Sequence, residues 1–350
     1  MNDDMRTKLI QAAIYAPSAD NSQPFRFKWS NDDTLQLFLD PELSGTATDS
    51  TFVLSDLAIG AIIESIVIEA KSLRFSVNIS LFPDREKDSY FVAQLSFESN
   101  DAAIPETELK LAQQIPLRCT DRRFPFSGDV SDHMIEEIKA AVNGDNCQLL
   151  GFNQRDKIDA IIPTIFKAEK VRFESEQLHQ ELFKTVSFTR DKVESGMNLD
   201  VLGISKFESK GFEWMSNWKV MRFLNKLGAS GQIAKKSVVS PIKQSPALLL
   251  LISSDVSREG IINAGRQLQR VWLKCTEMNL SVQLYAAPGV LSIAKPALSA
   301  SLMDTINTVE HEMKLLTAEL GSGVMFLRIG KYSGRPVRTG RRDIKSFIKN

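Results

Sequence analysis

The sequence predicts an α+β fold in which one chain holds two similar halves. Helical and strand patterns alternate irregularly along the 350 residues, which is typical of an α+β or mixed α/β class. The same order of helix, polar loop, apolar helix and strand also occurs twice. A chain of this length can form either one large domain or two domain-sized units.

The first half begins with a short amphipathic helix. Leu9, Ile10 and Ala13 share one helical face, and Pro17 comes just after the pattern ends. The alternation of apolar and polar side chains that follows is typical of half-buried strands. We therefore expect helices over 5–15 and 56–73, and strands over 24–29, 34–40, 75–82 and 90–97.

The second half predicts a helix over 131–142, with Ser131 or Asp132 as its N-cap. The run PALLLLI at 246–252 is far too short to span a membrane and is typical of a buried strand. Beyond it we expect a helix over 264–279 and strands over 280–286 and 323–331.

The internal repeat has two parts. APSADNSQPFRF at 16–27 aligns with AVNGDNCQLLGF at 141–152, with Ala, Asp, Asn, Gln and Phe at matching positions. The apolar stretch 60–81 aligns with 265–286, and each of these stretches begins with a glycine. Two matches in the same order indicate a duplicated fold.

The two alignments have different offsets, 125 and 205 residues, so the second half carries about 80 extra residues. We place this insertion at about 155–243 and interpret it as a helical lid. The aromatic stretch 212–223 would pack on a lid helix. The predicted halves are residues 1–112 and 113–350.

Charge and motif content argue against several classes of protein. Lys plus Arg and Asp plus Glu are both 43, so no overall basic field indicates nucleic acid. The sequence has no GxGxxG, no P-loop and no GxSxG pattern. We predict no metal site and no catalytic side chain, because the cysteines and histidines are scattered and lack CxxC spacing; they are Cys119, Cys147, Cys275, His133, His179 and His311.

No signal peptide is visible, because the start MNDDMRTKLIQAA lacks an apolar core behind a basic segment. We expect a cytoplasmic location and no membrane partner.

The stretch APSADNSQPF at 16–25 has two interpretations. It can be a helix stop followed by an Asx or Ser turn, since Asn and Asp bond their own backbone. It can also be a loop whose short side chains let a flat ligand approach the main chain. The turn alone does not explain Gln23 beside Pro24.

The stretch IPLRCTDRRFPF at 115–126 concentrates basic residues. In an extended segment, side chains two residues apart point to the same side, so Arg118, Thr120 and Arg122 would share one side. Two guanidinium groups and a hydroxyl placed together suit a phosphate. The alternative is that these arginines lie on the solvated surface and form ion pairs with Asp121. The stretch at 334–347 adds a second cluster, formed by Arg335, Arg338, Arg341 and Arg342.

Together these stretches resemble the FMN-dependent nitroreductase superfamily. APSADNSQPF is similar to that family's APSxxNxQPW loop, and RCTDRR to its RxSxR phosphate segment. The terminal RR of TGRRDIKSF resembles its closing basic motif. The layout resembles the two-half, Acg-like branch, in which one chain holds two nitroreductase-like halves.

The resemblance implies an FMN at the interface of two subunits or, here, of two halves. It implies that the loop faces the isoalloxazine and that the basic segments hold the phosphate. The implied cofactor-binding residues are Pro17, Ser18, Asn21, Gln23, Arg118, Thr120, Arg122, Arg341 and Arg342. Phe25 in place of Trp and Thr120 in place of Ser are departures from the family pattern, and the second keeps the hydroxyl.

The resemblance further implies an oxidoreductase in which N5 of the flavin carries the chemistry. NADH or NADPH would be the electron donor, and a small nitro, quinone or similar molecule the acceptor. We expect one FMN per chain in a monomer that imitates the family's dimer, because the loop at 145–148 lacks the Pro-Ser and Gln-Pro pairs. An FMN storage protein with a closed lid, and a scaffold that binds no flavin, remain open.

Overall fold

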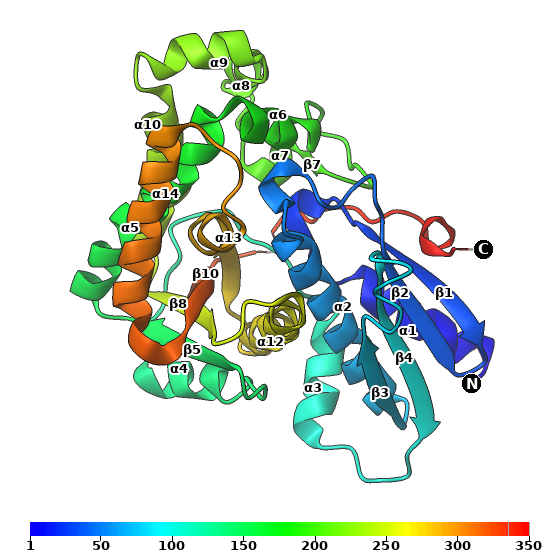
Figure 1. Ribbon diagram of the computed structural model, residues 1–350. Helices are drawn as coiled ribbons and strands as arrows, with labels where there is room; N and C mark the ends of the chain where they lie inside the picture. The colour runs from blue at the N-terminus through cyan, green and yellow to red at the C-terminus, as the bar shows by residue number, and fades with distance from the viewer. Residues whose placement is uncertain (335, 350) are drawn as a thin grey trace.

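The computed structural model describes residues 1–334 and 336–349, so Arg335 lies outside the described residues. The predicted α+β fold of two halves is confirmed. Each half has a four-stranded antiparallel sheet, and the two sheets lie on opposite sides of a pair of long central helices (Figure 1). The duplicated architecture expected from the repeat is therefore present.

The first half follows the predicted order closely. Its sheet has the strand order β1-β2-β4-β3, and α1 and α2 supply the apolar side chains of its core. Its elements are α1 (Asp3–Ile14), β1 (Phe25–Asn31), β2 (Thr34–Leu39), α2 (Val53–Ser72), β3 (Phe75–Leu81), β4 (Phe91–Ser99) and α3 (Glu106–Gln114), with short 3-10 turns at Ala19–Asn21 and Ala47–Asp49.

The second half repeats the first with additions. Its sheet has the order β5-β8-β10-β9, which matches the first sheet strand for strand. The corresponding elements are α4 (Asp132–Lys139), β5 (Cys147–Phe152), β8 (Ala247–Ser253), α12 (Arg258–Glu277), β9 (Ser281–Tyr285) and β10 (Ser322–Gly330). Ser131 accepts a hydrogen bond from the Met134 amide, so it is the N-cap of α4.

Two additions separate the second half from the first. The larger one lies between β5 and β8, where the offsets place the insertion. It comprises α5 (Arg155–Glu174), α6 (Glu176–Lys184), β6 (Val186–Ser187), β7 (Met197–Asn198), α7 (Leu199–Leu202), α8 (Ser209–Met215), α9 (Trp218–Asn225), α10 (Ala229–Ala234), a π-type turn (Lys235–Val239) and α11 (Ser240–Lys243). The smaller one, α13 (Ala287–Ala294) and α14 (Ala300–Thr317), was not predicted.

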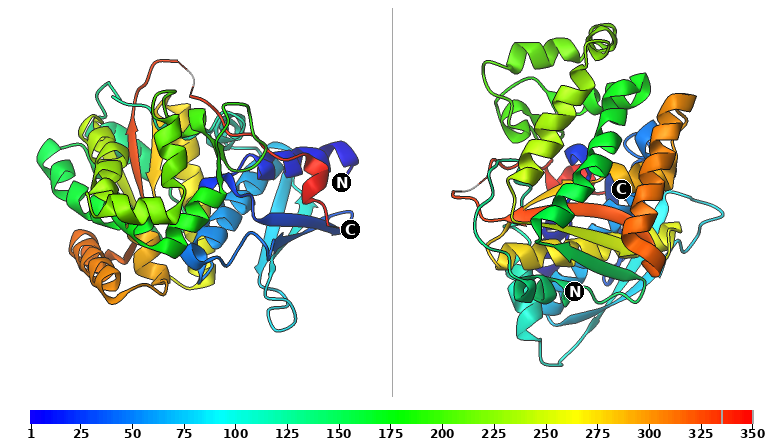
Figure 2. Two further views of the ribbon diagram at one scale, coloured as in Figure 1. Left: turned by 90° about the horizontal axis from the view of Figure 1, so that it is seen from above. Right: turned by 90° about the vertical axis from the view of Figure 1, so that its left-hand side faces the viewer.

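The additions explain why β8 is apolar along its whole length. Helices α5, α13 and α14 cover one face of the second sheet, and α12 covers the other (Figure 2). All seven residues of β8 are buried, as the run at 246–252 predicts. Within the described residues, no helix combines the length and apolarity needed to cross a bilayer.

The halves meet where α2 crosses α12. A Cβ atom at Gly60 would lie 2.0 Å from the carbonyl oxygen of Ile262, and one at Gly265 would lie 2.2 Å from that of Leu57. These two glycines are the matched pair at the start of the second repeat alignment. Only glycine permits this backbone contact, so the repeat keeps a glycine at the same place in each half.

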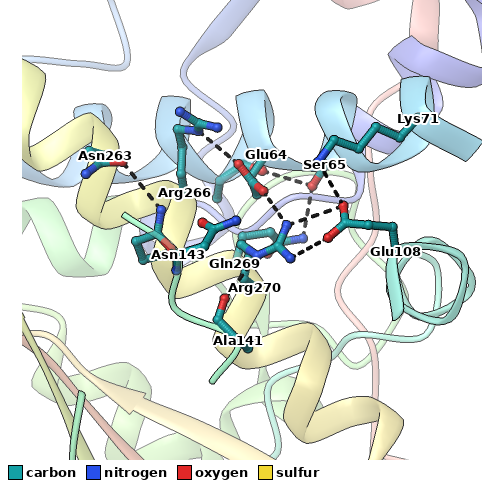
Figure 3. A network of polar contacts seen from close by, with 12 residues as sticks. Glu64, Ser65, Lys71, Glu108, Ala141, Asn143, Asn263, Arg266, Gln269 and Arg270 are labelled. Carbon is teal, nitrogen blue, oxygen red and sulfur yellow. Dashed lines mark hydrogen bonds and ion pairs between the residues drawn. The ribbon is translucent and has the colours of Figure 1, made fainter. Parts of the chain in front are cut away.

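A buried ion network joins the same two helices (Figure 3). Arg270 of α12 lies 2.8 Å from one oxygen of Glu64 on α2 and 2.5 Å from one oxygen of Glu108 on α3. Arg266 reaches the other oxygen of Glu64 at 2.9 Å, and Lys71 reaches Glu108 at 3.3 Å. Each buried carboxylate is therefore paired with a cation from the opposite half or from a neighbouring helix.

The C-terminal segment crosses from the second half to the first. The Lys349 amide donates a hydrogen bond to the Phe27 carbonyl at 2.7 Å, beside β1. Phe347 is fully buried in the first core, and its ring stacks on Phe25 with centroids 5.1 Å apart. This crossing carries the basic stretch before it onto the loop at 16–25.

We expect Gly60→Ala to lower the free energy of unfolding by about 1–3 kcal/mol, because the added methyl group must displace the facing backbone. Gly265→Ala should do the same. The matched control is Gly231→Ala in α10, because a Cβ atom at Gly231 would meet no atom within 4 Å. This substitution should stabilise the helix by about 0.5–1 kcal/mol. Chemical denaturation measures all three, and equal losses at all three sites would contradict this account of the crossing.

We expect Arg270→Met to lower the free energy of unfolding by about 3 kcal/mol, because it removes the buried cation shared by Glu64 and Glu108 and leaves each carboxylate with one partly exposed partner. Arg266→Met is the control, and its partly exposed pair should cost about 1 kcal/mol or less.

The penalty should depend on pH. Burial alone would raise the pKa of Glu108, but hydrogen bonds and charge from Arg270 and Lys71 outweigh it and hold that pKa below its ordinary value. The stabilisation is thus complete above the unfolded pKa of about 4.3 and is lost as pH falls through the lower folded value. The difference in free energy of unfolding between the wild type and Arg270→Met should become smaller below about pH 4.

Candidate functional site

A cavity of about 1380 Å³ lies between the two halves. The first half supplies the loop before β1 and the start of α2. The second half supplies the segment at 120–124, the end of β9 and the start of α13, and the insertion supplies α5, α6 and α8. The cavity is therefore composite, as expected for a duplicated fold whose ligand lies between the copies.

The loop at 16–25 presents some of its side chains to the cavity and uses others to hold its own shape. Pro17 and Ser18 line the cavity, together with Asp20, Ser22 and Pro24. The Ser18 hydroxyl accepts a hydrogen bond from the Gln23 main-chain amide at 3.0 Å, which closes the loop across five residues.

The same loop has an unusual backbone. Asp20, Asn21 and Gln23 all have positive φ, between 47° and 57°. This left-handed region is uncommon for residues other than glycine, and Asn and Asp are enriched in it. Such strain tends to cluster at ligand sites and persists only where surrounding contacts enforce it.

Asn21 and Gln23 supply those contacts and do not line the cavity. The Asn21 amide nitrogen donates to the carbonyls of Gly196 and Gly340, at 3.1 and 3.3 Å. The Gln23 amide nitrogen donates to the Glu194 carbonyl at 2.8 Å. Both side chains therefore tie the loop to a short piece of the insertion, residues 193–197, which we call the strap.

The segment at 118–122 is anchored along the edge of β9. Thr120 pairs with Val282, and the Asp121 amide donates to the Val282 carbonyl at 2.8 Å. Thr120 and Arg122 then face the cavity. Arg118 does not line it, although the alternation predicted all three on one side.

Arg118 instead packs between the halves. Its guanidinium donates to the Tyr15 carbonyl at 2.8 Å and lies 4.2 Å from the centre of the Trp272 ring. Its Nε atom is buried and has no hydrogen-bond partner among the described residues. Burial, with a smaller contribution from the nearby Arg341, lowers the pKa of Arg118.

Arg122 lines the cavity and forms no ion pair with a carboxylate among the described residues. Within the described residues its guanidinium contacts only the Met197 sulfur at 3.3 Å and the Val201 carbonyl at 3.5 Å. Burial lowers its pKa. Arg123, in contrast, pairs with Asp121 at 2.8 Å. The alternative of an Asp121-paired run therefore holds for Arg123 and not for Arg122.

Arg341 and Arg342 hold the loop from behind. Arg341 donates to the Ile14 carbonyl at 2.7 Å and to the Asn21 amide oxygen at 2.8 Å. Arg342 donates to the Gln23 carbonyl, and its main-chain amide donates to the Gln23 side chain at 3.2 Å. Neither lines the cavity, so in this structure both act on the loop's backbone and amide groups.

The insertion adds cavity residues that the sequence interpretation missed. Arg172 of α5 pairs with Asp20 at 3.2 Å, and Glu169 lies one turn earlier on the same helix. Burial raises the pKa of Glu169, and Asp20 adds to this while Arg172 and Arg122 oppose it. In the sequence, the only signal for these two residues is their spacing of three, which places Glu169 and Arg172 on the same face of a helix.

Two features of the lining could suit a flat ligand with an anionic end. A strained polar loop with small side chains lines one part of the cavity, and the Thr120 hydroxyl and the Arg122 guanidinium line another. Among the described residues, no group of three His, Cys, Asp or Glu could hold a metal ion.

Comparisons with known proteins agree with this picture. No protein-family model matches the chain. The chain is 25% identical over 278 residues to an uncharacterized protein of Mycobacterium tuberculosis, covering 79% of this chain and 38% of that protein. It is 28% identical over 183 residues to the putative NAD(P)H nitroreductase acg of the same organism, covering 51% of this chain and 53% of that one. The chain thus spans about half the length, or less, of these curated relatives.

Two solved structures show weaker likeness. One is the FMN-dependent nitroreductase NfnB from Mycobacterium smegmatis in complex with NADPH, with 13% identity, a TM-score of 0.38, and coverage of 69% of this chain and 98% of that one. Another is a nitroreductase with bound FMN from Desulfitobacterium hafniense, with 11% identity, a TM-score of 0.38, and coverage of 69% and 97%.

The loop and basic motifs, the two matching halves and the similarity to the acg nitroreductase agree with one another. Over about half of its length, the chain is similar to a putative NAD(P)H nitroreductase.

Proposed function

We propose that the chain is an FMN-binding oxidoreductase that reduces small nitro, quinone or similar acceptors with electrons from NADH or NADPH. The observation that carries this proposal is the composite cavity, with the loop at 17–24 on one side and Thr120 and Arg122 on the other. A single cavity of this kind supports one FMN per chain in a monomer, and a cytoplasmic location stays a prediction.

The residues present fit a flavin phosphate. Arg122 is a largely buried cation without a carboxylate among the described residues, and an unpaired buried charge is costly. A phosphate beside Thr120 and Arg122 would offset that cost through charge-assisted hydrogen bonds. Arg118, Arg341 and Arg342 do not line the cavity and each donates to a backbone carbonyl, so they would contribute positive field and loop geometry.

The loop would position the ring system. Pro17 and Ser18 line the cavity, while Asn21 and Gln23 fix the backbone that presents them. When bound, FMN would supply the hydride and electron transfer, and the chain supplies orientation and exclusion of water. The cavity exceeds the roughly 300–1,000 Å³ of ordinary ligand pockets, so it has room for a second flat molecule beside a flavin.

One observation favours a second candidate function, storage of FMN. The strap is bound to the loop from both directions: the Gly196 amide donates to the Asn21 carbonyl at 3.1 Å, and Gln23 donates to Glu194. An insertion held this way would act as a closed cover. In that case the flavin would bind without turning over.

The purified chain should be yellow and should release one FMN per chain on denaturation, as measured by absorbance. Under anaerobic conditions NADPH or NADH should bleach the flavin band, because the donor can stack beside the ring. A flavin that binds but stays oxidised would favour storage. A colourless protein that takes up no added FMN would contradict both functions.

We expect Arg122→Ala to weaken FMN binding about 10- to 100-fold, the equivalent of losing one charge-assisted contact. Fluorescence titration of the apoprotein measures the change. Arg155→Ala is the control, because Arg155 pairs with Asp159 on the surface of α5 and lies outside the cavity. Unchanged affinity in Arg122→Ala would remove the phosphate from this end of the cavity.

A further inference from the structure

The far end of the insertion exposes large apolar side chains to solvent. Phe207, Trp214, Phe223 and Leu227 are 97%, 71%, 62% and 73% exposed. They lie on or beside α8 and α9, which project from one end of the molecule away from both sheets (Figures 1 and 2). Isolated exposed apolar residues are ordinary, but a concentration of them marks an interaction site.

Helix α9 is apolar on two opposite sides. Its inner side packs through Met221, which is fully buried. Val220 and Phe223 are exposed and lie three residues apart on the outer side, and exposed Leu227 follows in the turn just after the helix. The aromatic stretch at 212–223 therefore does more than the packing role predicted for it, because packing accounts only for the inner side.

The same region is strongly basic in a chain that has no net charge. Residues 206–236 contain seven Lys or Arg and two Glu. Lys236 pairs with Glu208. The other six have no ion pair among the described residues, and all are exposed; they are Lys206, Lys210, Lys219, Arg222, Lys226 and Lys235. We call these six cations and the exposed apolar residues the lid patch.

We propose that the lid patch docks on the surface of a membrane that contains anionic lipid. Short amphipathic helices with Trp, Phe or Leu among Lys and Arg bind in this way, with the apolar side chains entering the headgroup boundary and the cations meeting lipid phosphates. A protein partner would be expected to bring carboxylates for six unpaired cations, whereas an anionic bilayer supplies dispersed negative charge to all of them.

This contact needs no spanning helix. The predicted absence of a membrane partner rests on the lack of a spanning segment, which holds for the described residues, and does not apply to a surface contact. The patch is also continuous with the cavity, because Phe207, Phe212 and Met215 line the cavity on the same part of the insertion. If the proposed oxidoreductase function holds, an acceptor dissolved in lipid would meet the cavity at this end.

Vesicle flotation with the full chain tests the docking without requiring bound flavin or turnover. The chain should float with vesicles of phosphatidylcholine plus 30% phosphatidylserine, and raising the salt from 50 to 500 mM should release most of it. Phosphatidylcholine alone should retain at least tenfold less. Its failure would leave the FMN and NADPH experiments unaffected, so the two proposals can be overturned separately.

Two pairs of variants separate the apolar and charged contributions. Phe223→Ser with Leu227→Ser should reduce flotation at least fivefold, whereas Leu315→Ser on α14, also exposed, should not. Lys219→Glu with Lys226→Glu should abolish the lipid-charge dependence, whereas Lys157→Glu on α5 should not.

Absence of flotation at 50 mM salt would overturn the proposal. So would a concentration-dependent dimer that disappears in Phe223→Ser/Leu227→Ser, because the patch would then be an interface between copies of the chain. Equal loss in the control variants would also overturn it.

Discussion

The contact of two backbones at Gly60 and Gly265 sets the geometry of the whole molecule. It lets α2 and α12 approach more closely than any side chain would permit, and the buried pairs of Arg270 with Glu64 and Glu108 then fix the angle and register of that approach. Because each glycine belongs to the corresponding helix of its half, a duplicated sequence produces a symmetric contact from a single residue type. The two sheets lie outward from this crossing, and the cavity lies beside it, with residues of α2 and α12 in its wall.

The position of the cavity explains why the site has parts so far apart in the sequence. The loop at 16–25 precedes β1 in the first half, and the segment at 118–122 follows the edge of β9 in the second half. The C-terminal segment returns to β1, where Phe347 is buried, and places Arg341 and Arg342 behind the loop. The strained φ values of Asp20, Asn21 and Gln23 are thus maintained by groups that lie about 170 and 320 residues away in the sequence. A change in the strap or in the tail would be expected to alter the loop without touching the cavity.

Much of the fold could be predicted because its signals are local. The apolar periodicity of α2, the uninterrupted run in β8 and the Ser131 cap each depend on a few neighbouring residues. The matched order of the repeat extended these to two similar halves, although the strand order within each sheet was not predicted. Helices α13 and α14 were missed because the first half has no counterpart to align with them.

The site was predicted less well. The alternation of side chains in a strand predicted that Arg118 would lie on the same side as Thr120 and Arg122. In the structure Arg118 instead packs on the ring of Trp272, which lies 154 residues away in the sequence. Likewise Asn21 and Gln23 are motif residues whose partners are backbone carbonyls, which no side-chain pattern reveals.

The insertion has to satisfy two requirements that conflict where its outer side faces water. To cover the cavity it must bury apolar side chains such as Met221 and Met197 against α5 and the loop. A helix that only covered a cavity would be polar on its outer side, because exposed apolar area adds nothing to stability and promotes association. Helix α9 has Val220 and Phe223 there instead, with Leu227 in the turn after it, and the cations around them lack carboxylate partners in the part of the chain that is described. Exposed apolar side chains beside unpaired cations are only slightly unfavourable if a binding partner covers the outer side of the helix when the protein functions. The surface that closes the cavity on one side is therefore suited to contact a partner on the other, and that contact would bear directly on whether the cavity is open.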